Sequence, residues 1–126
     1  SQCIMKNNAV IMLGSNTDMN MLLSAISMLE DWFDVIAVSE IRKTTAIGEH
    51  YQSPFYNQAI RIKTEYDREE TIRIFKKTEK KLGRTAESKK EGIVPIDIDL
   101  IVWNGEICHD DYYRFDFVKK CVDEIT

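Results

Sequence analysis

The sequence predicts a single α+β domain in which four strands and two helices follow the order β-α-β-β-α-β, with a short helix at the end. Three observations lead to this prediction. The length of 126 residues suits one domain. Apolar runs and alternating segments are interleaved with stretches of helical periodicity. Neither a linker nor an internal repeat divides the chain, so we expect residues 1–126 to form one unit.

The first part of the chain predicts a strand, a helix and a second strand. Residues 9–13 form an apolar run closed by Gly14, which indicates a buried strand and a turn. Asp18 is placed to cap a helix. Residues 35–45 are rich in residues that favour strands and predict the second strand. The helix between them has apolar positions at helical spacing, namely Leu22, Leu23, Ile26, Leu29 and Phe33.

The middle of the chain predicts a loop, a strand and a helix. Residues 47–54 indicate a loop, and residues 55–64 alternate well enough to predict the third strand. Asp67 should cap the second helix, and Gly83 should end it. The partly buried face of this helix is expected to carry Ile72, Phe75, Glu79 and Leu82.

The last part predicts a loop, a strand and a short helix. Residues 85–92 are polar, without apolar periodicity, and indicate a mobile loop. Residues 95–103 predict the fourth strand, closed by a tight Asn104-Gly105 turn. Residues 116–125 predict a short amphipathic helix. Two split βαβ units of this kind form a ferredoxin-like sandwich, with an antiparallel sheet, helices mainly on one face and the other face open to ligands.

Composition excludes some classes of partner. The net charge of −4 and the pI of about 5.2 disfavour nucleic-acid binding, because such domains carry a basic face. No apolar run is long enough for a membrane span, and the first residues lack a signal-peptide layout. Three cysteines, an odd number without a C-x-x-C pair, favour a reducing, cytoplasmic location. A monomer is favoured, although the sequence leaves the oligomeric state open.

The sharpest chemical signal is a pair of acids in the fourth strand. Asp97 and Asp99 are two residues apart, so their carboxylates should point to one face, about 6.6 Å apart along the strand. Two like charges repel, and a bound Mg²⁺ would remove that cost while also taking phosphate oxygens. The alternative is an open sheet face that carries solvated acids. The side chains expected to face the helices instead are Ile96, Ile98, Leu100 and Val102.

Three weaker signals accompany the acids. Gly14 would let a ligand approach the backbone closely, although an ordinary turn would look the same. Phe55 and Asn57 share one strand face, where a ring can stack on a flat heterocycle and an amide can hydrogen-bond it. Arg84 and Lys90 lie in or near the polar loop and could close over a polyphosphate. Ordinary surface residues remain the alternative in each case.

In this order, these segments resemble the 6-hydroxymethyl-7,8-dihydropterin pyrophosphokinases. No single motif decides the resemblance, but five colinear segments at near-identical spacing are specific. The five segments are Met12-Leu13-Gly14-Ser15-Asn16, Lys43-Thr44-Thr45-Ala46-Ile47-Gly48, Phe55-Tyr56-Asn57-Gln58-Ala59, Glu79-Lys80-Lys81-Leu82-Gly83-Arg84 and Ile96-Asp97-Ile98-Asp99-Leu100.

The resemblance implies an activity and roles for individual residues. Members of the family transfer pyrophosphate from ATP to the hydroxymethyl group of a reduced pterin, with Mg²⁺, in folate biosynthesis. By this resemblance Asp97 and Asp99 would hold two Mg²⁺ ions, and Arg84 would lie near the phosphates. The implied pterin-binding residues are Gly14, Thr44, Thr45, Ala46, Ile47, Phe55, Asn57 and Phe117. The implied ATP-binding residues are Glu79, Lys90 and Arg114.

The chain also departs from the family pattern. The family's Arg-Trp-Gly-Pro-Arg loop is replaced by Lys90-Glu91-Gly92-Ile93-Val94, and Ala86 stands where another arginine is expected. The segment with a Pro-His pair and several ligand-binding arginines is shortened. These departures leave two readings open: an active, divergent pyrophosphokinase, or a non-catalytic paralogue that binds a pterin or a nucleotide.

Overall fold

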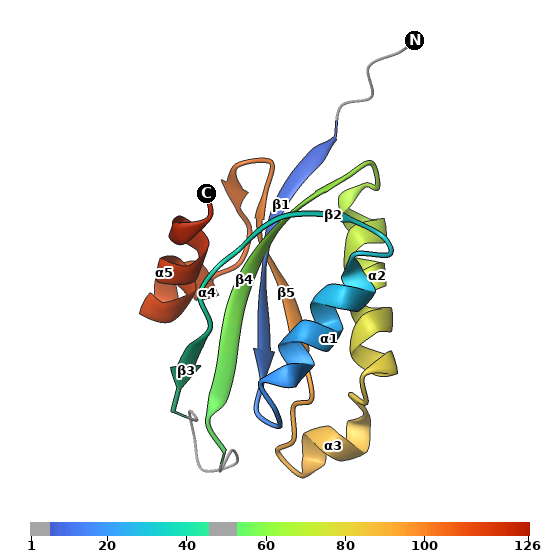
Figure 1. The fold of residues 1–126 in the computed structure, drawn as a ribbon, viewed down its shortest axis with the longest axis vertical. Helices are drawn as coiled ribbons and strands as arrows, with labels where there is room; N and C mark the ends of the chain where they lie inside the picture. Colours follow the sequence, from blue (N-terminus) through green and yellow to red (C-terminus); the bar gives the residue numbers. More distant parts are fainter. Residues whose placement is uncertain (1–5, 46–52) are drawn as a thin grey trace.

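The computed structural model describes residues 6–45 and 53–126 and contains one antiparallel sheet flanked by helices (Figure 1). The sheet order is β2-β4-β1-β5-β6, with β3 also paired to β4. This order confirms the predicted α+β class with an antiparallel sheet. The elements are β1 (Asn7–Ser15), α1 (Asn20–Leu29), β2 (Asp34–Val38), β3 (Arg42–Thr44), β4 (Phe55–Thr64), α2 (Arg68–Lys81), α3 (Ala86–Lys90), β5 (Asp97–Trp103), β6 (Glu106–Ile107), α4 (Asp111–Arg114) and α5 (Asp116–Glu124).

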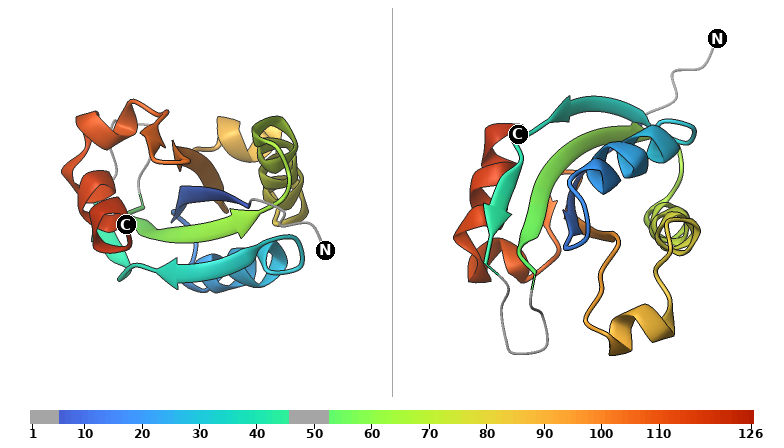
Figure 2. Two further views of the ribbon diagram at one scale, coloured as in Figure 1. Left: turned by 90° about the horizontal axis from the view of Figure 1, so that it is seen from above. Right: turned by 60° about the horizontal axis from the view of Figure 1, so that its bottom comes forward.

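The sheet has helices on both faces, in unequal amounts (Figure 2). Helices α1 and α2 pack on one face and bury the larger core, which includes Ile11, Leu22, Ile60 and Phe75. Helix α5 packs on the opposite face over a smaller core that includes Met12 and Cys121. Each fully buried aliphatic or aromatic side chain contributes about 1.5–3 kcal/mol. Because α5 packs there, the second face of the sheet, which was expected to be open to ligands, is partly covered.

Helix α2 begins and ends as its sequence predicts. The Asp67 carboxylate accepts a hydrogen bond from the backbone N–H of Glu70 at 2.8 Å. At the other end Gly83 adopts a φ of 102°, a conformation that residues with a Cβ rarely adopt. This left-handed residue turns the chain so that the N–H of Arg84 bonds to the carbonyl of Glu79 at 3.0 Å. The turn delivers Arg84 to the edge of the sheet.

Helix α1 departs from its prediction at both ends and at one side chain. Its N-cap is Met19, without a side-chain hydrogen bond, and it ends at Leu29, so Phe33 lies after the helix. The Asp18 carboxylate accepts a hydrogen bond from the N–H of Asn20 at 2.8 Å, but Asp18 lies one residue before the N-cap, so the predicted cap was wrong. Leu22 and Leu29 are fully buried against the sheet. Leu23 was expected on the same face but is 65% exposed. It directly follows Leu22, so its side chain points to a different side of the helix.

The predicted second strand, over residues 35–45, is in fact two strands. Ser39 interrupts it: its hydroxyl accepts a hydrogen bond from the N–H of Ala59 at 2.9 Å. Its carbonyl accepts one from the side chain of Gln58, also at 2.9 Å. A side chain thus replaces part of the strand ladder, and β2 and β3 pair with different halves of β4.

The predicted mobile loop over residues 85–92 contains the short helix α3. Thr85 and Ser88 form a reciprocal capping box, with hydrogen bonds of 3.0 and 2.9 Å between side chain and backbone. The Thr-x-x-Ser spacing was the sequence signal for this helix, and it went unrecognised. The other predicted loop, residues 47–54, falls mostly outside the described residues.

A register shift in β5 changes which face its last residues occupy. Ile98 and Leu100 join the larger core, as predicted. Pairing with β1 then shifts at Ile101, and Val102 lies in the smaller core under α5. The prediction for Val102 was therefore wrong, because a β-bulge inserts one residue and reverses the alternation. Within the described part of the chain, no helix is long and apolar enough to cross a membrane.

Candidate active site

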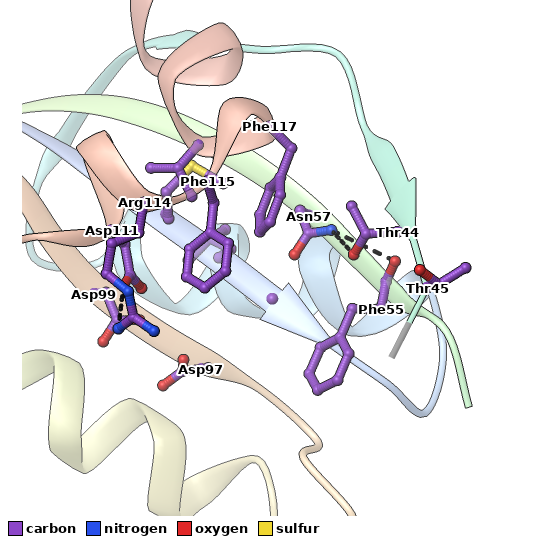
Figure 3. Close-up of a pocket in the computed structure, with 14 residues that line it drawn as sticks. Thr44, Thr45, Phe55, Asn57, Asp97, Asp99, Asp111, Arg114, Phe115 and Phe117 are labelled. Atoms are coloured by element: carbon purple, nitrogen blue, oxygen red, sulfur yellow. Dashed lines mark hydrogen bonds and ion pairs between the residues drawn. The ribbon is translucent and has the colours of Figure 1, made fainter. Parts of the chain in front are cut away.

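A cavity of about 380 Å³ opens on the face of the sheet that carries α5 (Figure 3). It has two ends of different character. We call the first the aromatic end, which is formed by Gly14, Thr44, Thr45, Phe55, Asn57 and Phe117. We call the second the acidic end, which is formed by Asp97, Asp99, Asp111 and Arg114.

Strand pairing assembles the aromatic end. Phe55 and Asn57 alternate onto the cavity face of β4, as their spacing predicted. Strand β3 places Thr44 opposite Phe55, and β1 places Gly14 opposite Asn57. Phe117 reaches the cavity from α5 (Figure 3). Two further predicted pterin-binding residues, Ala46 and Ile47, lie outside the described residues.

The Asn57 side chain is held in one orientation. Its amide nitrogen donates to the carbonyl of Arg42 at 2.9 Å and to the hydroxyl of Thr44 at 3.0 Å. The amide oxygen is on the side of Gly14. A Cβ on Gly14 would lie 3.5 Å from that oxygen and 4.0 Å from the Phe55 ring. The missing side chain therefore keeps the cavity floor clear beside a fixed hydrogen-bond acceptor.

Two carboxylates from β5 face the cavity at the acidic end. Asp97 pairs with Gly14 and Asp99 with Met12, so both side chains lie on the predicted face. Burial, together with the charge of Asp97, raises the pKa of Asp99 to about 8. Burial also opposes ionisation of Asp97, but hydrogen bonds with Asp99 and Arg84 lower its pKa.

The raised pKa of Asp99 beside the lowered pKa of Asp97 favours one proton held by the pair over two negative charges side by side. A divalent cation bound between the two acids would replace the proton and remove the repulsion. Carboxylate oxygens are the ligands that Mg²⁺ takes from proteins. The residues present therefore fit the magnesium ions that the sequence predicts.

Comparison with known proteins identifies the relationship. A family model described as 7,8-dihydro-6-hydroxymethylpterin-pyrophosphokinase (HPPK) matches residues 10–126. The chain belongs to this family. Members from two bacteria named 2-amino-4-hydroxy-6-hydroxymethyldihydropteridine pyrophosphokinase are similar to it. The chain is 33% identical to that of Aquifex aeolicus over 97 residues. It is 34% identical to that of Bacillus subtilis over 106 residues.

These HPPK relatives are longer than the chain. The matched residues make up 75% of the chain and 60% of the Aquifex protein, and 81% of the chain and 63% of the Bacillus protein. The chain thus spans about three fifths of the curated relatives it matches. A crystal structure of an HPPK-DHPS protein from Plasmodium falciparum shares the fold, with a TM-score of 0.64 at 17% identity. That match covers 82% of the chain and 31% of the Plasmodium chain.

Arg84, which the HPPK resemblance places near the phosphates, contacts an acid of the cavity. Its guanidinium donates to Asp97 at 2.5 Å and to Glu79 at 2.9 Å. Glu79 is only 3% exposed and accepts a hydrogen bond from the N–H of Ile98 at 2.7 Å. Burial raises the pKa of Glu79, while the Ile98 N–H, Arg84 and Lys76 oppose this rise. Glu79 thus ties α2 to β5, and its ATP-binding role stays a prediction.

Lys90, the other predicted phosphate contact, lies on α3 and is exposed. It is not among the described residues that line the cavity. The chain after α3 is fixed by Asn16, whose amide donates to the carbonyl of Gly92 at 2.8 Å. The Asn16 side-chain oxygen also accepts from the N–H of Val94 at 2.7 Å. This latch of Asn16, Gly92 and Val94 joins the end of the α3 segment to the turn after β1.

Asp111 and Phe115 are among the cavity-lining residues that the sequence reasoning missed. Asp111 lies 3.8 Å from the guanidinium of Arg114. That guanidinium also lies over the Phe115 ring, 5.1 Å from its centroid. The i,i+3 pairing of Asp111 with Arg114 was the available signal for helix α4, which brings all three residues to the cavity.

Proposed function

We propose that this chain transfers pyrophosphate from ATP to the hydroxymethyl group of 6-hydroxymethyl-7,8-dihydropterin, with Mg²⁺, in folate biosynthesis. The observation that carries the proposal is the single cavity that joins the aromatic end to the acidic end. A flat heterocycle bound at the aromatic end would direct a substituent toward the carboxylates of the acidic end. Family membership supports the same reaction.

The aromatic end would bind and orient the pterin. The oxygen of Asn57 accepts a hydrogen bond from a ring N–H or amino group, since its own amide nitrogen is already bonded. The rings of Phe55 and Phe117 provide apolar faces for the heterocycle. Because these groups are fixed before binding, little ordering is needed to align the hydroxymethyl group.

The acidic end would receive the phosphates. Asp97 and Asp99 would hold Mg²⁺, which neutralises phosphate charge and orients the phosphate oxygens. Asp99 must release its proton for this, and Arg84 stands beside Asp97 as a cation near the developing charge. Phosphoryl-type transfer needs alignment and charge stabilisation more than covalent help from the protein.

A second reading is a paralogue that binds a pterin or a nucleotide without turnover. One observation favours it: among the described residues that line the cavity, Arg114 supplies the one positive charge, and it is ion-paired with Asp111. In this reading the aromatic end still binds its ligand.

An AMP-release assay with ATP, Mg²⁺ and the reduced pterin separates the two. The pyrophosphokinase reading predicts AMP release that requires both substrates and the metal. A chain that binds the pterin in a fluorescence titration and releases no AMP above background is a binding paralogue. If the chain neither releases AMP nor binds the pterin, the proposed pterin site is wrong.

We also propose a monomer in the cytoplasm. Among the described residues, Cys108 and Cys121 are free thiols, the state expected in a reducing compartment. Light scattering during size-exclusion chromatography would test the first part, and cell fractionation the second.

A further inference from the structure

Three side chains of types that bind metals meet beside the acidic end of the cavity. Asp99 comes from β5, His109 from the connection between β6 and α4, and Asp111 from the start of α4. One ligand atom from each lies within 4.8 Å of the other two. Asp99 and Asp111 also line the cavity. The group therefore has an open side where an ion and its water ligands can enter.

We propose that Asp99, His109 and Asp111 form a divalent-cation site that prefers a first-row transition ion, with Mn²⁺ as the probe, over Mg²⁺. This site is distinct from the Asp97–Asp99 pair, although it shares Asp99. The proposal concerns binding of the metal by the chain alone, so it can hold or fail independently of pyrophosphate transfer.

The histidine is in the form that a metal requires. Its Nδ1 accepts a hydrogen bond from the backbone N–H of Asp111 at 3.1 Å, so this atom carries a lone pair. The same nitrogen lies 3.7 Å from the Asp111 carboxylate. Metal bonds of about 2.0–2.2 Å to nitrogen and oxygen place neighbouring ligand atoms roughly 3–3.5 Å apart. Small side-chain rotations therefore suffice, at the cost of one backbone hydrogen bond.

Ligand chemistry sets the metal preference. Mg²⁺ takes oxygen ligands, keeps several waters and gains little from an imidazole. Transition ions bind imidazole nitrogen more strongly, so a set of two carboxylates and one imidazole favours them. His109 is the group that discriminates, and the two acids supply charge for either kind of ion.

One cation competes for this site. Arg114 lies 3.8 Å from Oδ1 of Asp111, but its side chain is 68% exposed, so water screens the ion pair and the guanidinium can swing away. The other oxygen of Asp111 faces His109. An incoming metal thus displaces a weak surface contact and not a buried one.

Titration calorimetry of the chain with Mn²⁺ or Mg²⁺, without nucleotide, tests the proposal. We expect Mn²⁺ to bind tighter than Mg²⁺ by about tenfold or more. His109→Gln should weaken Mn²⁺ by about tenfold or more and Mg²⁺ far less, which removes the preference. Asp111→Asn should weaken both ions. Pulsed electron paramagnetic resonance of bound Mn²⁺ should show coupling to an imidazole nitrogen, a signal that misfolding cannot imitate.

Two controls locate the ion. Asp110→Asn removes one exposed acid next to the site and should leave Mn²⁺ affinity within about twofold, since screened surface charge contributes little. Asp97→Asn should retain Mn²⁺ binding and the nitrogen coupling. The proposal fails if His109→Gln binds Mn²⁺ as the parent does, if Asp110→Asn weakens it equally, or if Asp97→Asn alone abolishes it.

Discussion

The aromatic and acidic ends of the cavity are built on different physical principles. At the aromatic end, the Asn57 amide donates two hydrogen bonds to strand β3 and presents one acceptor to the ligand. At the acidic end, Asp97, Asp99 and Asp111 place three carboxyl groups close together in partly buried positions. The first arrangement is relaxed before a ligand arrives. The second is balanced in part by Arg84 beside Asp97 and by Arg114 beside Asp111, and a bound metal ion would relieve the remaining repulsion.

The largest expected effect comes from removing the acidic pair. Asp97→Ala combined with Asp99→Ala should lower AMP release by at least about 10²–10³, because the phosphate charge loses its stabilisation. Pterin affinity, measured by fluorescence titration, should stay within about threefold, because the aromatic end is untouched. Loss of pterin binding in this variant would show that the two ends are not separable. Asp110→Asn, which removes a negative charge outside the acidic pair, is the control for a change in charge alone.

A smaller effect is expected at the aromatic end. Asn57→Ala removes the acceptor and leaves the carbonyl of Arg42 without its amide donor, so pterin affinity should fall by about 10- to 100-fold, or roughly 1–3 kcal/mol. Thr44→Val removes only one partner of the Asn57 amide and should cost less, about two- to fivefold. Equal losses in both variants would mean that orientation of Asn57 matters more than its oxygen. No loss in either would reject the pocket.

A third effect is on stability and on its dependence on pH. The folded-state pKa of Asp99, about 8, lies above its ordinary value of 3.8, so the folded chain holds the extra proton between those pH values. Stability from this group is therefore complete below pH 4 and is lost as pH rises toward 8. Thermal unfolding at pH 6 and pH 9 should show the parent losing more stability than Asp99→Asn. An identical pH slope in the two proteins would contradict the pKa shift.

Local patterns predicted most of the fold and both ends of the cavity. Period-two alternation placed Asp97 with Asp99 and Phe55 with Asn57 on one sheet face, because strand geometry is set by the chain itself. The break at Ser39 and the shift at Ile101 depend on neighbouring strands, so no pattern within their own segments revealed them. Such features arise from pairing between distant parts of the sequence.

The missed cavity residues share that cause. Asp111 and Phe115 reach the cavity because α4 and α5 lie across the sheet, and the sequence around them gives no sign of where those helices dock. Phe117 was found only through the family resemblance. Helix α3 was missed for a different reason: its capping box is local and was visible at Thr85 and Ser88.

The latch formed by Asn16, Gly92 and Val94 has a mechanical consequence. Together with the left-handed turn at Gly83, it makes two fixed pivots on either side of α3. Any rigid-body movement of this helix is then a rotation about the line that joins these two fixed points. Such a rotation would leave in place the paired strands β1 and β4, which carry Gly14 and Asn57.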